Sequence, residues 1–553
     1  MAPFEKLSRE LITKIVDQLC YNSDIVLPRT RRNAHSPQII LSQISHLWRR
    51  VVHSTTSLFS CYEISLSPNI TAEMGQMLVD QTAHYTRIWR ASKGIVLNDL
   101  GDGLRFYFAL TGPNRHYRDF ADSESYVAAV NMIWTVLETH GVDMEALAFL
   151  LTEQAIVHLG SRGKLALYHL EELEIRMFIG QPKDDDSIGW AGIEEGDDED
   201  DHPEAPAARF MLHPSDEDSE LFETMGALTK LTFGFQEEPR RVLELIQWAI
   251  PYFQLTTLAL PNVWLPFYDC VKVLREAIPL EHCRLACVTP ILSDGIITEY
   301  WDAKQRDPAP LDNLEDIEIT FQTTLHSHLF AHFTSSSLSR MRLSTLPRPE
   351  ADWKKEPEMP WLQHNFPDWI ESCPNLTTLE VYFEFGNDPE SDERDNIAIR
   401  HDVDALQQML AAAANANSAI VELDLFWRPL QASAESKFGE LFELITKSDH
   451  PTHINVDATI RSVRMLKTRL EAEGLMQMED MALYTPKRQD CSESEYEALQ
   501  QEIRVLKTAL RGKNIPLKVA EVGDPNDDGQ PKGWKTIDIE EEDEQGEGEG
   551  QEK

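Results

Sequence analysis

A short phrase with leucine at regular positions recurs along this chain and constrains its fold more than any other feature. In the copy CPNLTTLEVYF, residues 373–383, Leu376, Leu379 and Val381 follow the pattern L-x-x-L-x-L. Side chains alternate along a strand, so the last two of these positions point to the same face of a short strand. Repetition of the phrase predicts a series of similar strands that share one core.

Further copies of the phrase lie on both sides of this one. They are Leu170, Leu173, Ile175; Leu228, Leu231, Phe233; Leu255, Leu258, Leu260; Leu314, Ile317, Ile319; Leu338, Met341, Leu343; Ile420, Leu423, Leu425; and a weaker copy, His282, Leu285, Cys287. Steps of 27, 27, 32, 24, 38 and 44 residues separate the first positions from Leu228 onward. The first four steps fit one strand plus one returning helix, and the last two leave room for insertions.

Several segments between the copies have apolar residues at helical spacing, for example residues 242–249 and 406–413. Alternation of strand and helix predicts an α/β fold with parallel strands and excludes an all-β fold. One alternative for the fold is an ordinary α/β domain whose strands happen to contain leucine at alternate positions.

The N-terminal region has a second pattern, a pair of helices with apolar stripes. In residues 6–19 apolar side chains recur at helical spacing, Ser8 can cap the helix start, and Glu10 lies in the first turn. A polar segment, residues 21–36, separates this helix from a second helical pattern over residues 40–52.

The segments LSRELITKIVDQL, ILSQISHLWRRVV and SLFSCYEIS together resemble an F-box of the type common in fungi, over about residues 4–66. The matching residues are Leu7, Glu10, Trp48, Arg49, Leu58, Phe59 and Ile64. Ser8 stands where the family usually has proline, and the polar segment after Leu19 is longer than usual. The recurring phrase resembles leucine-rich repeats of the irregular kind, without the full consensus and its Asn or Cys ladder.

An F-box followed by leucine-rich repeats is a known pairing, and it implies a substrate-recognition subunit of a cullin-RING ubiquitin ligase. The helix pair would bind a Skp-type adaptor, which connects to the cullin, and the concave strand face would bind an unidentified target protein. The resemblance places the adaptor contacts at Leu7, Glu10, Leu11, Ile15, Leu19, Trp48 and Leu58. The alternative is a repeat scaffold whose F-box has drifted and no longer binds the adaptor.

The expected architecture is an F-box-like helical unit followed by an irregular leucine-rich-repeat solenoid, with parallel strands and with helices on its convex side. The expected parts are a helical F-box-like domain, 4–66; a helical linker or degenerate repeats, 67–165; the repeat domain, 166–457, with an acidic insertion at 183–220; a helical cap, 458–512; and an acidic tail, 513–553. Within them, 94–98 is expected to be a short strand, 144–158 an amphipathic helix, and 454–456 the last strand.

Charge is the strongest deviation in composition, with a formal net charge of −42. Residues 184–204 contain 11 acids and no Lys or Arg, and residues 521–553 contain 13 acids against 3 Lys. Such segments bury too little apolar surface to fold, so residues 183–207 and 523–553 are expected to be disordered. A surface this negative argues against nucleic-acid or anionic-membrane partners, which need clustered Lys and Arg.

Seven cysteines without framework spacing, and no apolar run of about 18 residues, predict a cytoplasmic or nuclear protein with reduced thiols. His282, Cys283 and Cys287 form the one Cys/His cluster, but it lacks a second pair of ligands, so no metal site is expected. Phosphate-binding glycine loops, the G-x-S-x-G phrase and the H-E-x-x-H phrase are all missing. The prediction is a non-catalytic protein without a cofactor.

Overall fold

The computed structural model describes residues 7–20, 24–28, 36–93, 103–110, 124–160, 162, 165–178, 224–236, 241–242, 250–288, 308–321, 329–345, 369–370, 372–383, 422–427, 453–457, 460, 463–464, 466–468, 480–485, 492–512 and 515–521. The chain divides into two compact units. Unit 1 comprises Met1–Gln322 and His328–Ser336, and unit 2 comprises Thr323–Ser327 and Ser337–Lys553. The segments 183–207 and 523–553, expected to be disordered, lie outside the described residues.

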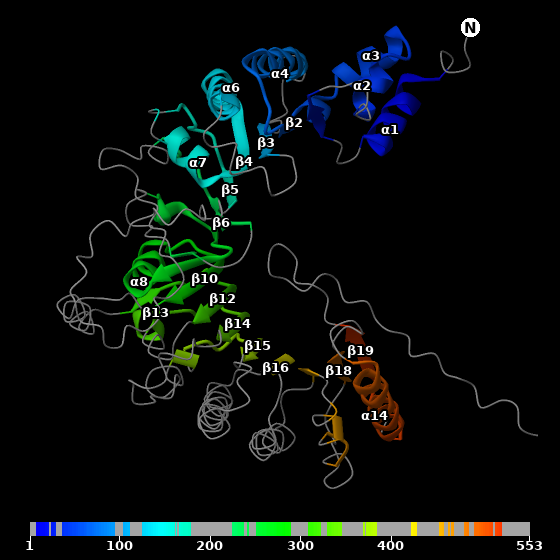
Figure 1. Cartoon of the computed structure of the whole chain (residues 1–553), viewed down its shortest axis with the longest axis vertical. Coiled ribbons are helices and arrows are strands. Elements are labelled where there is room, and N and C mark those ends of the chain that lie inside the picture. Colours follow the sequence, from blue (N-terminus) through cyan, green and yellow to red (C-terminus); the bar gives the residue numbers. More distant parts are fainter. Residues whose placement is uncertain are drawn as a thin grey trace, which may run out of the picture. The chain divides into compact units, whose positions relative to one another are not determined.

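Unit 1 is built from helices and short strands that alternate along much of its length (Figure 1). Its helices are α1 (Arg9–Leu19), α2 (Pro37–Ser42), α3 (His46–His53), α4 (Ala72–Lys93), α6 (Glu124–His140), α7 (Glu153–Gly160) and α8 (Phe267–Glu276), with 3₁₀ helices η2 (Thr56–Phe59), η4 (Gly141–Asp143) and η7 (Tyr252–Gln254). Its strands are β1 (Ile25–Leu27), β2 (Cys61–Leu66), β3 (Leu104–Leu110), β4 (Met144–Thr152), β5 (Glu172–Phe178), β6 (Lys230–Phe235), β7 (Arg241–Val242), β8 (Thr257–Ala259), β9 (Val263–Pro266), β10 (His282–Val288), β11 (Ala309–Pro310), β12 (Asp316–Phe321) and β13 (Phe333–Thr334).

The three N-terminal helices pack against one another because each has one buried face. Ser8 caps α1 as predicted, since its side chain accepts a hydrogen bond from the Leu11 backbone N–H at 3.3 Å. Ser45 caps α3 in the same way, with the Trp48 N–H at 3.4 Å. The buried side chains of this helical unit are Ile12, Val16, Ile39, Leu41, Trp48, Val51 and Val52.

The main sheet of unit 1 is parallel, and its strands pair mostly in chain order: β1, β2, β3, β4, β5, β6, β8, β10 and β12. The pairing register brings one residue of each strand into a continuous buried row. These residues are Ile25, Tyr62, Phe106, Leu147, Leu173, Leu231, Leu258, Cys283 and Ile317. The predicted α/β class with parallel strands is therefore confirmed for this unit.

Residues 67–165, expected to be mostly helical, contain two strands of this sheet, β3 and β4. The expected helix over 144–158 is wrong, because Met144–Thr152 is a strand and only Glu153–Gly160 is helical. Aromatic side chains replace leucine in this part of the core, and the rings of Tyr62 and Phe106 stack with centroids 4.8 Å apart. A search for leucine alone missed these strands. The strand expected at 94–98 lies outside the described residues.

The helices of unit 1 lie beside the sheet in chain order. In Figure 1, α4, α6 and α7 follow one another on one side of β2–β5, and α7 packs against β4 and β5. Helix α8 packs against β9 and β10. The buried side chains of α6 include Ala129, Val130, Ile133 and Val136, so this helix covers apolar strand residues and closes the core.

Gly234 in β6 is required by a close approach of the backbone. A Cβ atom at this position would lie 2.0 Å from the carbonyl oxygen of Pro261, which accepts a hydrogen bond from the Phe235 N–H at 3.0 Å. Asn262, which follows Pro261, has a φ of 54°, and its side-chain amide donates a hydrogen bond to the Phe235 carbonyl at 3.1 Å. The turn after β8 therefore folds back onto β6, and only glycine leaves room for it.

The weaker copy of the phrase, His282, Leu285 and Cys287, starts two residues later than the core positions of β10 do. The register pairs Cys283 with Leu258, and it pairs His282 with Thr257 on the opposite, half-buried side of β8. The true core positions are Leu280, Cys283 and Leu285, all buried, while His282 is exposed.

Unit 2 contains β14 (Arg340–Thr345), β15 (Thr378–Phe383), β16 (Glu422–Trp427), β17 (His453–Asp457), β18 (Asp480–Thr485), α14 (Glu493–Arg511) and β19 (Leu517–Glu521). Its described strands pair in parallel and in chain order. The register again forms one row, through Met341, Leu379, Leu423, Ile454, Met481 and Leu517.

The C-terminal boundaries expected for this unit are wrong. Residues 454–456 belong to β17 but are not the last strand, because β18 and β19 follow. The segment 458–512 is therefore not a purely helical cap, and the tail expected from 513 begins with a strand. Helix α14 itself is confirmed, with the predicted capping box of Ser492 and Glu495.

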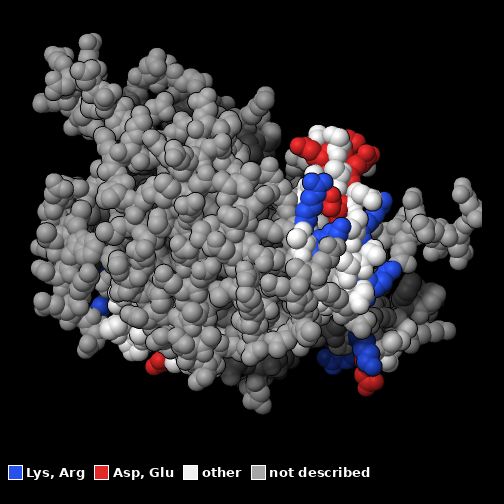
Figure 2. Space-filling model, turned by 90° about the horizontal axis from the view of Figure 1, so that it is seen from below, with Lys and Arg blue, Asp and Glu red and all other residues white. Residues whose placement is uncertain are grey.

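The surface of α14 carries charges that suit the helix dipole. Acids lie in its first turn, at Glu493 and Glu495, and Arg511 lies in its last turn. Figure 2 shows carboxylates gathered at the top of the coloured surface, with Lys and Arg side chains below them and further carboxylates among and beyond these cations. The Arg464 side chain pairs with Glu502 of α14 at 2.7 Å, so the segment before β18 contacts this helix.

Candidate functional site

Helix α1 presents a row of side chains away from the buried core of the helical unit. Leu7, Leu11, Ile15 and Leu19 are spaced four residues apart, which places them on one side of the chain at α1. Leu11 and Leu19 are 45% and 55% exposed, while Leu7 and Ile15 are half-buried. Glu10 is also exposed. These five predicted adaptor contacts are accessible to a partner.

Two other predicted contacts are not accessible. Trp48 is 3% exposed because its helix, α3, packs against α1 and α2, and Leu58 is 8% exposed because its 3₁₀ helix, η2, packs against α3 and α4. The Leu58 carbonyl accepts a hydrogen bond from the buried side chain of Gln38 at 3.2 Å, which ties η2 to α2. A partner docking on this folded unit does not reach either side chain, so their assignment as contacts is corrected to a core role.

The structure adds two residues that sequence reasoning assigned only to a helical stripe. Ile40 and Ile44, four residues apart at α2 and its C-terminal turn, are about as exposed as Leu11, while Ile39 and Leu41 are buried. Spacing shows which side chains share a face, but the packing of α1 and α3 decides which face stays open. We call Leu11, Leu19, Ile40 and Ile44 the helical-unit patch.

The strand face opposite the buried row is polar and crossed by ion pairs. Arg105 of β3 contacts Glu145 at 2.6 Å and Glu172 at 3.7 Å, and Glu172 in turn contacts Lys230 at 2.5 Å. These pairs link β3, β4, β5 and β6 along the start of the strands. Partly exposed pairs of this kind contribute little stability, so the face remains available for a polar partner.

Tyr107 is the exposed aromatic residue of this face among the described residues. The strand register pairs Tyr107 with Glu63 of β2 on one side and with Ala148 of β4 on the other, and Ala148 pairs in turn with Glu174 of β5. Partial burial first, and then the Glu174 and Glu63 carboxylates, raise the pKa of the Tyr107 hydroxyl, which is therefore a neutral hydrogen-bond donor at pH 7. An amphipathic side chain of this kind suits protein recognition.

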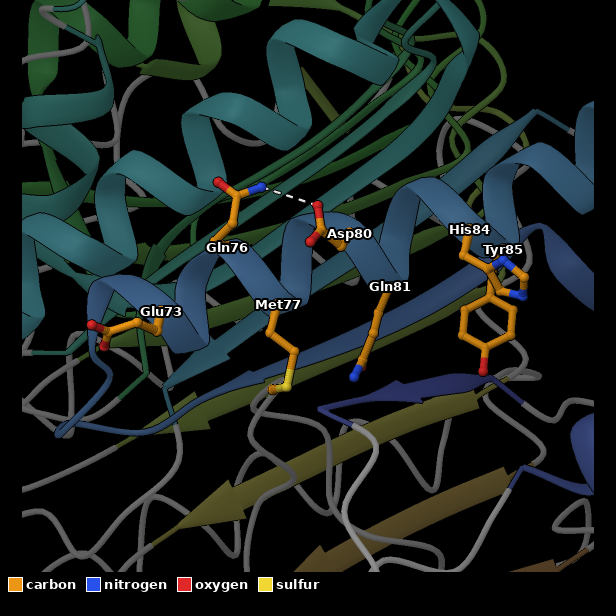
Figure 3. A pocket seen from close by; sticks show the side chains of 7 residues that line it. All are labelled: Glu73, Gln76, Met77, Asp80, Gln81, His84 and Tyr85. Atoms are coloured by element: carbon orange, nitrogen blue, oxygen red, sulfur yellow. Dashed lines mark hydrogen bonds between the residues drawn. The ribbon is translucent and has the colours of Figure 1, made fainter.

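A shallow groove of about 540 Å³ runs along one face of α4 (Figure 3). Met77, Gln81 and Tyr85 point to the same side of α4. The Gln76 side chain donates a hydrogen bond to the Asp80 carboxylate at 3.0 Å. Tyr85 also stacks on Phe59 of η2, with ring centroids 6.4 Å apart. The lining residues, Glu73, Gln76, Met77, Asp80, Gln81, His84 and Tyr85, mix polar side chains with Met77 and Tyr85.

Among the described residues, no group of three or more His, Cys, Asp or Glu side chains is arranged to hold a metal ion. The Cys283 and Cys287 side chains of β10 and Cys270 of α8 are buried in the apolar core. Burial raises the pKa of both Cys270 and Cys283, so these groups stay protonated as small apolar side chains.

The comparisons with known proteins add no relatives. No protein-family model matches this chain, and no curated protein matches it either. Within the described part of the chain, every helix is too short or too polar to span a lipid bilayer.

Proposed function

We propose that this protein is an F-box receptor of the leucine-rich-repeat type, the substrate-recognition subunit of a cullin-RING ubiquitin ligase. The helical unit of α1–α3 would bind a Skp-type adaptor, and the parallel strands would form a repeat solenoid that binds a target protein. The observation that carries the proposal is the helical-unit patch, four large apolar side chains left exposed over a well-packed core.

The patch supports docking for an energetic reason. Fully burying one large aliphatic side chain contributes about 1.5–3 kcal/mol, and these four side chains, each about half exposed, gain part of that from a matching partner. Trp48, Val51 and Val52 hold the helices together without using Leu11 or Leu19. The unit can therefore stay folded while its outer side chains bind.

The proposed target surface is the polar strand face around Tyr107. Parallel strands in chain order, each followed by a returning segment, support a repeat solenoid, in which stacked strands form an extended binding surface. The paired charges of Arg105, Glu172 and Lys230 favour a protein target with mixed polar side chains rather than a polyanion. Such a receptor would act in the cytoplasm or nucleus, without catalysis or a cofactor of its own.

Binding of the full-length protein to a recombinant Skp-type adaptor tests the proposal. The double variant Leu11→Ser, Leu19→Ser should lower the affinity at least about 10-fold, because a few central contacts carry most of the binding energy of an interface. The matched control is Val127→Ser on α6, since Val127 is 47% exposed and lies outside the helical-unit patch. Circular dichroism checks that each variant is folded.

The same experiment separates the two functions. Failure of the wild-type protein to bind the adaptor would favour the scaffold with a drifted F-box, for which Ser8 and the long segment before α2 are the relevant features. Full affinity in the double variant would instead show that the docking face is misassigned.

A further inference from the structure

The strands of unit 1 from β4 onward begin with the same backbone turn. In each turn an N–H donates to the carbonyl three residues earlier, and both residues are buried. The pairs are Met144 to Gly141, Leu170 to Leu167, Leu228 to Met225, Leu255 to Tyr252, Leu280 to Ala277 and Leu314 to Leu311. The residue after each acceptor is the outward tip of the turn.

The strand register places five of these tips side by side. Backbone hydrogen bonds of 2.8–2.9 Å join the residues three positions after each tip, in the order Glu145, Glu171, Thr229, Thr256 and Glu281. The tips are Val142, Tyr168, Gly226, Phe253 and Ile278, which we call the edge row. Adjacent strands lie ~4.8 Å apart, so the row extends over roughly 19 Å at the N-terminal edge of the sheet.

Four members of the edge row are large apolar side chains, and all four are exposed. Phe253 is 70% exposed, and Val142, Tyr168 and Ile278 are each more than half exposed. Turn positions usually hold Asp, Asn, Ser, Gly or Pro, as at the next tip, Asp312. Single exposed apolar residues are ordinary, but a contiguous row of them marks an interaction site.

Gly226 leaves a gap in the middle of the row. A Cβ atom there would meet no atom within 4 Å, so the space between Tyr168 and Phe253 is open. A large side chain of a partner fits such a gap between two aromatic rings.

The border of the edge row is acidic. Glu171 and Glu281 are exposed, lie at the same edge of the sheet, and form no ion pair with the described residues. Glu276, two residues before Ile278, is also exposed. Charge complementarity therefore calls for a partner with Lys or Arg beside its apolar residues.

We propose that the edge row binds an amphipathic helix of a partner protein, with lysine or arginine along both sides of its apolar stripe. Successive turns of a helix rise ~5.4 Å, close to the spacing of the tips, so apolar residues at i, i+4, i+7 and i+11 follow the row. About 13 helical residues cover its length. The proposal is independent of adaptor docking through the helical-unit patch.

Designed peptides of about 14 residues test this with the full-length protein. The first peptide has a leucine stripe bordered by Lys, and the second has the same stripe bordered by Glu. The third has the composition of the first in scrambled order, so its binding measures non-specific attraction of a cationic peptide to an acidic protein. Fluorescence anisotropy should show binding of the first peptide at least about 10-fold tighter than of the other two.

Variants of the row locate the binding. Tyr168→Ser with Phe253→Ser should weaken the Lys-bordered peptide about 10-fold, and Gly226→Leu, which fills the gap without a clash, should weaken it as well. Val127→Ser should leave it unchanged. Equal binding of the Lys-bordered and scrambled peptides would overturn the proposal, as would full affinity in the double variant. A wild-type dimer that Phe253→Ser converts to monomer would identify a second copy as the occupant and also overturn it.

Discussion

Glu380 of β15 lies between two arginines and is 3% exposed. Its carboxylate accepts from Arg340 Nε at 2.7 Å and from Arg342 Nε at 2.5 Å. Burial alone would raise the pKa of Glu380, but Arg342, and then Arg340, more than offset this and hold the pKa below its usual value. The hydrogen bonds from Arg340 and Arg342 to Glu380 therefore link β14 to β15 and favour a single pairing register of these strands.

Glu380→Gln should lower the free energy of unfolding by roughly 3–5 kcal/mol at pH 7, because it leaves the Arg342 charge buried without its partner. A depressed pKa in the folded state gives stability above the usual carboxyl pKa and loses it as the pH falls through the folded value. Urea titrations should therefore show the difference from wild type shrinking in acid. The control Glu172→Gln, in an exposed pair, should cost about 1 kcal/mol or less; equal losses in the two variants would contradict this account.

Cysteine reactivity follows burial at the same scale. Of the described cysteines, Cys61 is half-buried and the others, including Cys270, Cys283 and Cys287, are buried. Thiolates are the reactive form, and burial raises the pKa of Cys270 and Cys283.

A thiol reagent at pH 8, followed by peptide mass spectrometry, should modify Cys61 in the native protein well before the buried cysteines. Addition of denaturant should make all of them react. Early modification of Cys283 in the native state would show that β10 opens or is misplaced.

The repeating element is a turn followed by a short strand, with four inward positions rather than the three of L-x-x-L-x-L. The additional position comes first in the chain and is the buried turn residue. Tyr252 is an example, since it precedes Leu255, Leu258 and Leu260. A search with all four positions, accepting Gly, Ala, Cys, Met and Phe, would have identified the correct register of β10 and the strand β4, whose four positions are Gly141, Met144, Leu147 and Phe149. Thr257, on the other side of β8, is half-buried.

Leu258→Ala should destabilise the protein by about 2–5 kcal/mol, since it opens a cavity in a row that adjoining strands cannot close. Thr257→Ala, the next residue on the opposite face, should stay within about 1 kcal/mol of wild type. Chemical denaturation of both variants gives the comparison. A similar cost for both changes would mean that β8 does not present Leu258 to the core.

At the scale of the whole molecule, the start of the acidic tail, expected at residue 513, is the feature that composition misplaced. Pairing of Met481 with Leu517 and of Leu483 with Val519 makes β19 part of the unit 2 sheet, although acidic residues follow immediately. Met481, Leu483 and Val519 are all buried.

A chain that stops after Gly512 should be markedly less stable than wild type, because loss of β19 uncovers β18 and leaves its ladder groups unpaired. A chain that stops after Val522 removes only the acidic tail and should unfold like the full-length protein, with equal or better thermal stability through reduced charge repulsion. Thermal melts of the two truncations decide the point: identical midpoints would show that β19 contributes nothing to the sheet.

The sequence by itself determined the α/β class, the parallel strands and most of their core residues. Leu173, Leu231, Leu258, Ile317 and Leu379 occupy the positions that their spacing predicts, because alternation along a strand is a local property of the backbone. The caps at Ser8 and Ser492 were predictable for the same reason, since a cap depends on residues three positions apart.

Only the tertiary structure decided which faces are covered. Leu11 and Trp48 both belong to apolar helical stripes, yet one is exposed and the other buried, because α1 and α3 meet through one side of each helix. The edge row depends likewise on register between strands far apart in sequence, which brings Tyr168 and Phe253 to the same edge. Local spacing defines a face, whereas burial of that face depends on distant segments that pack against it.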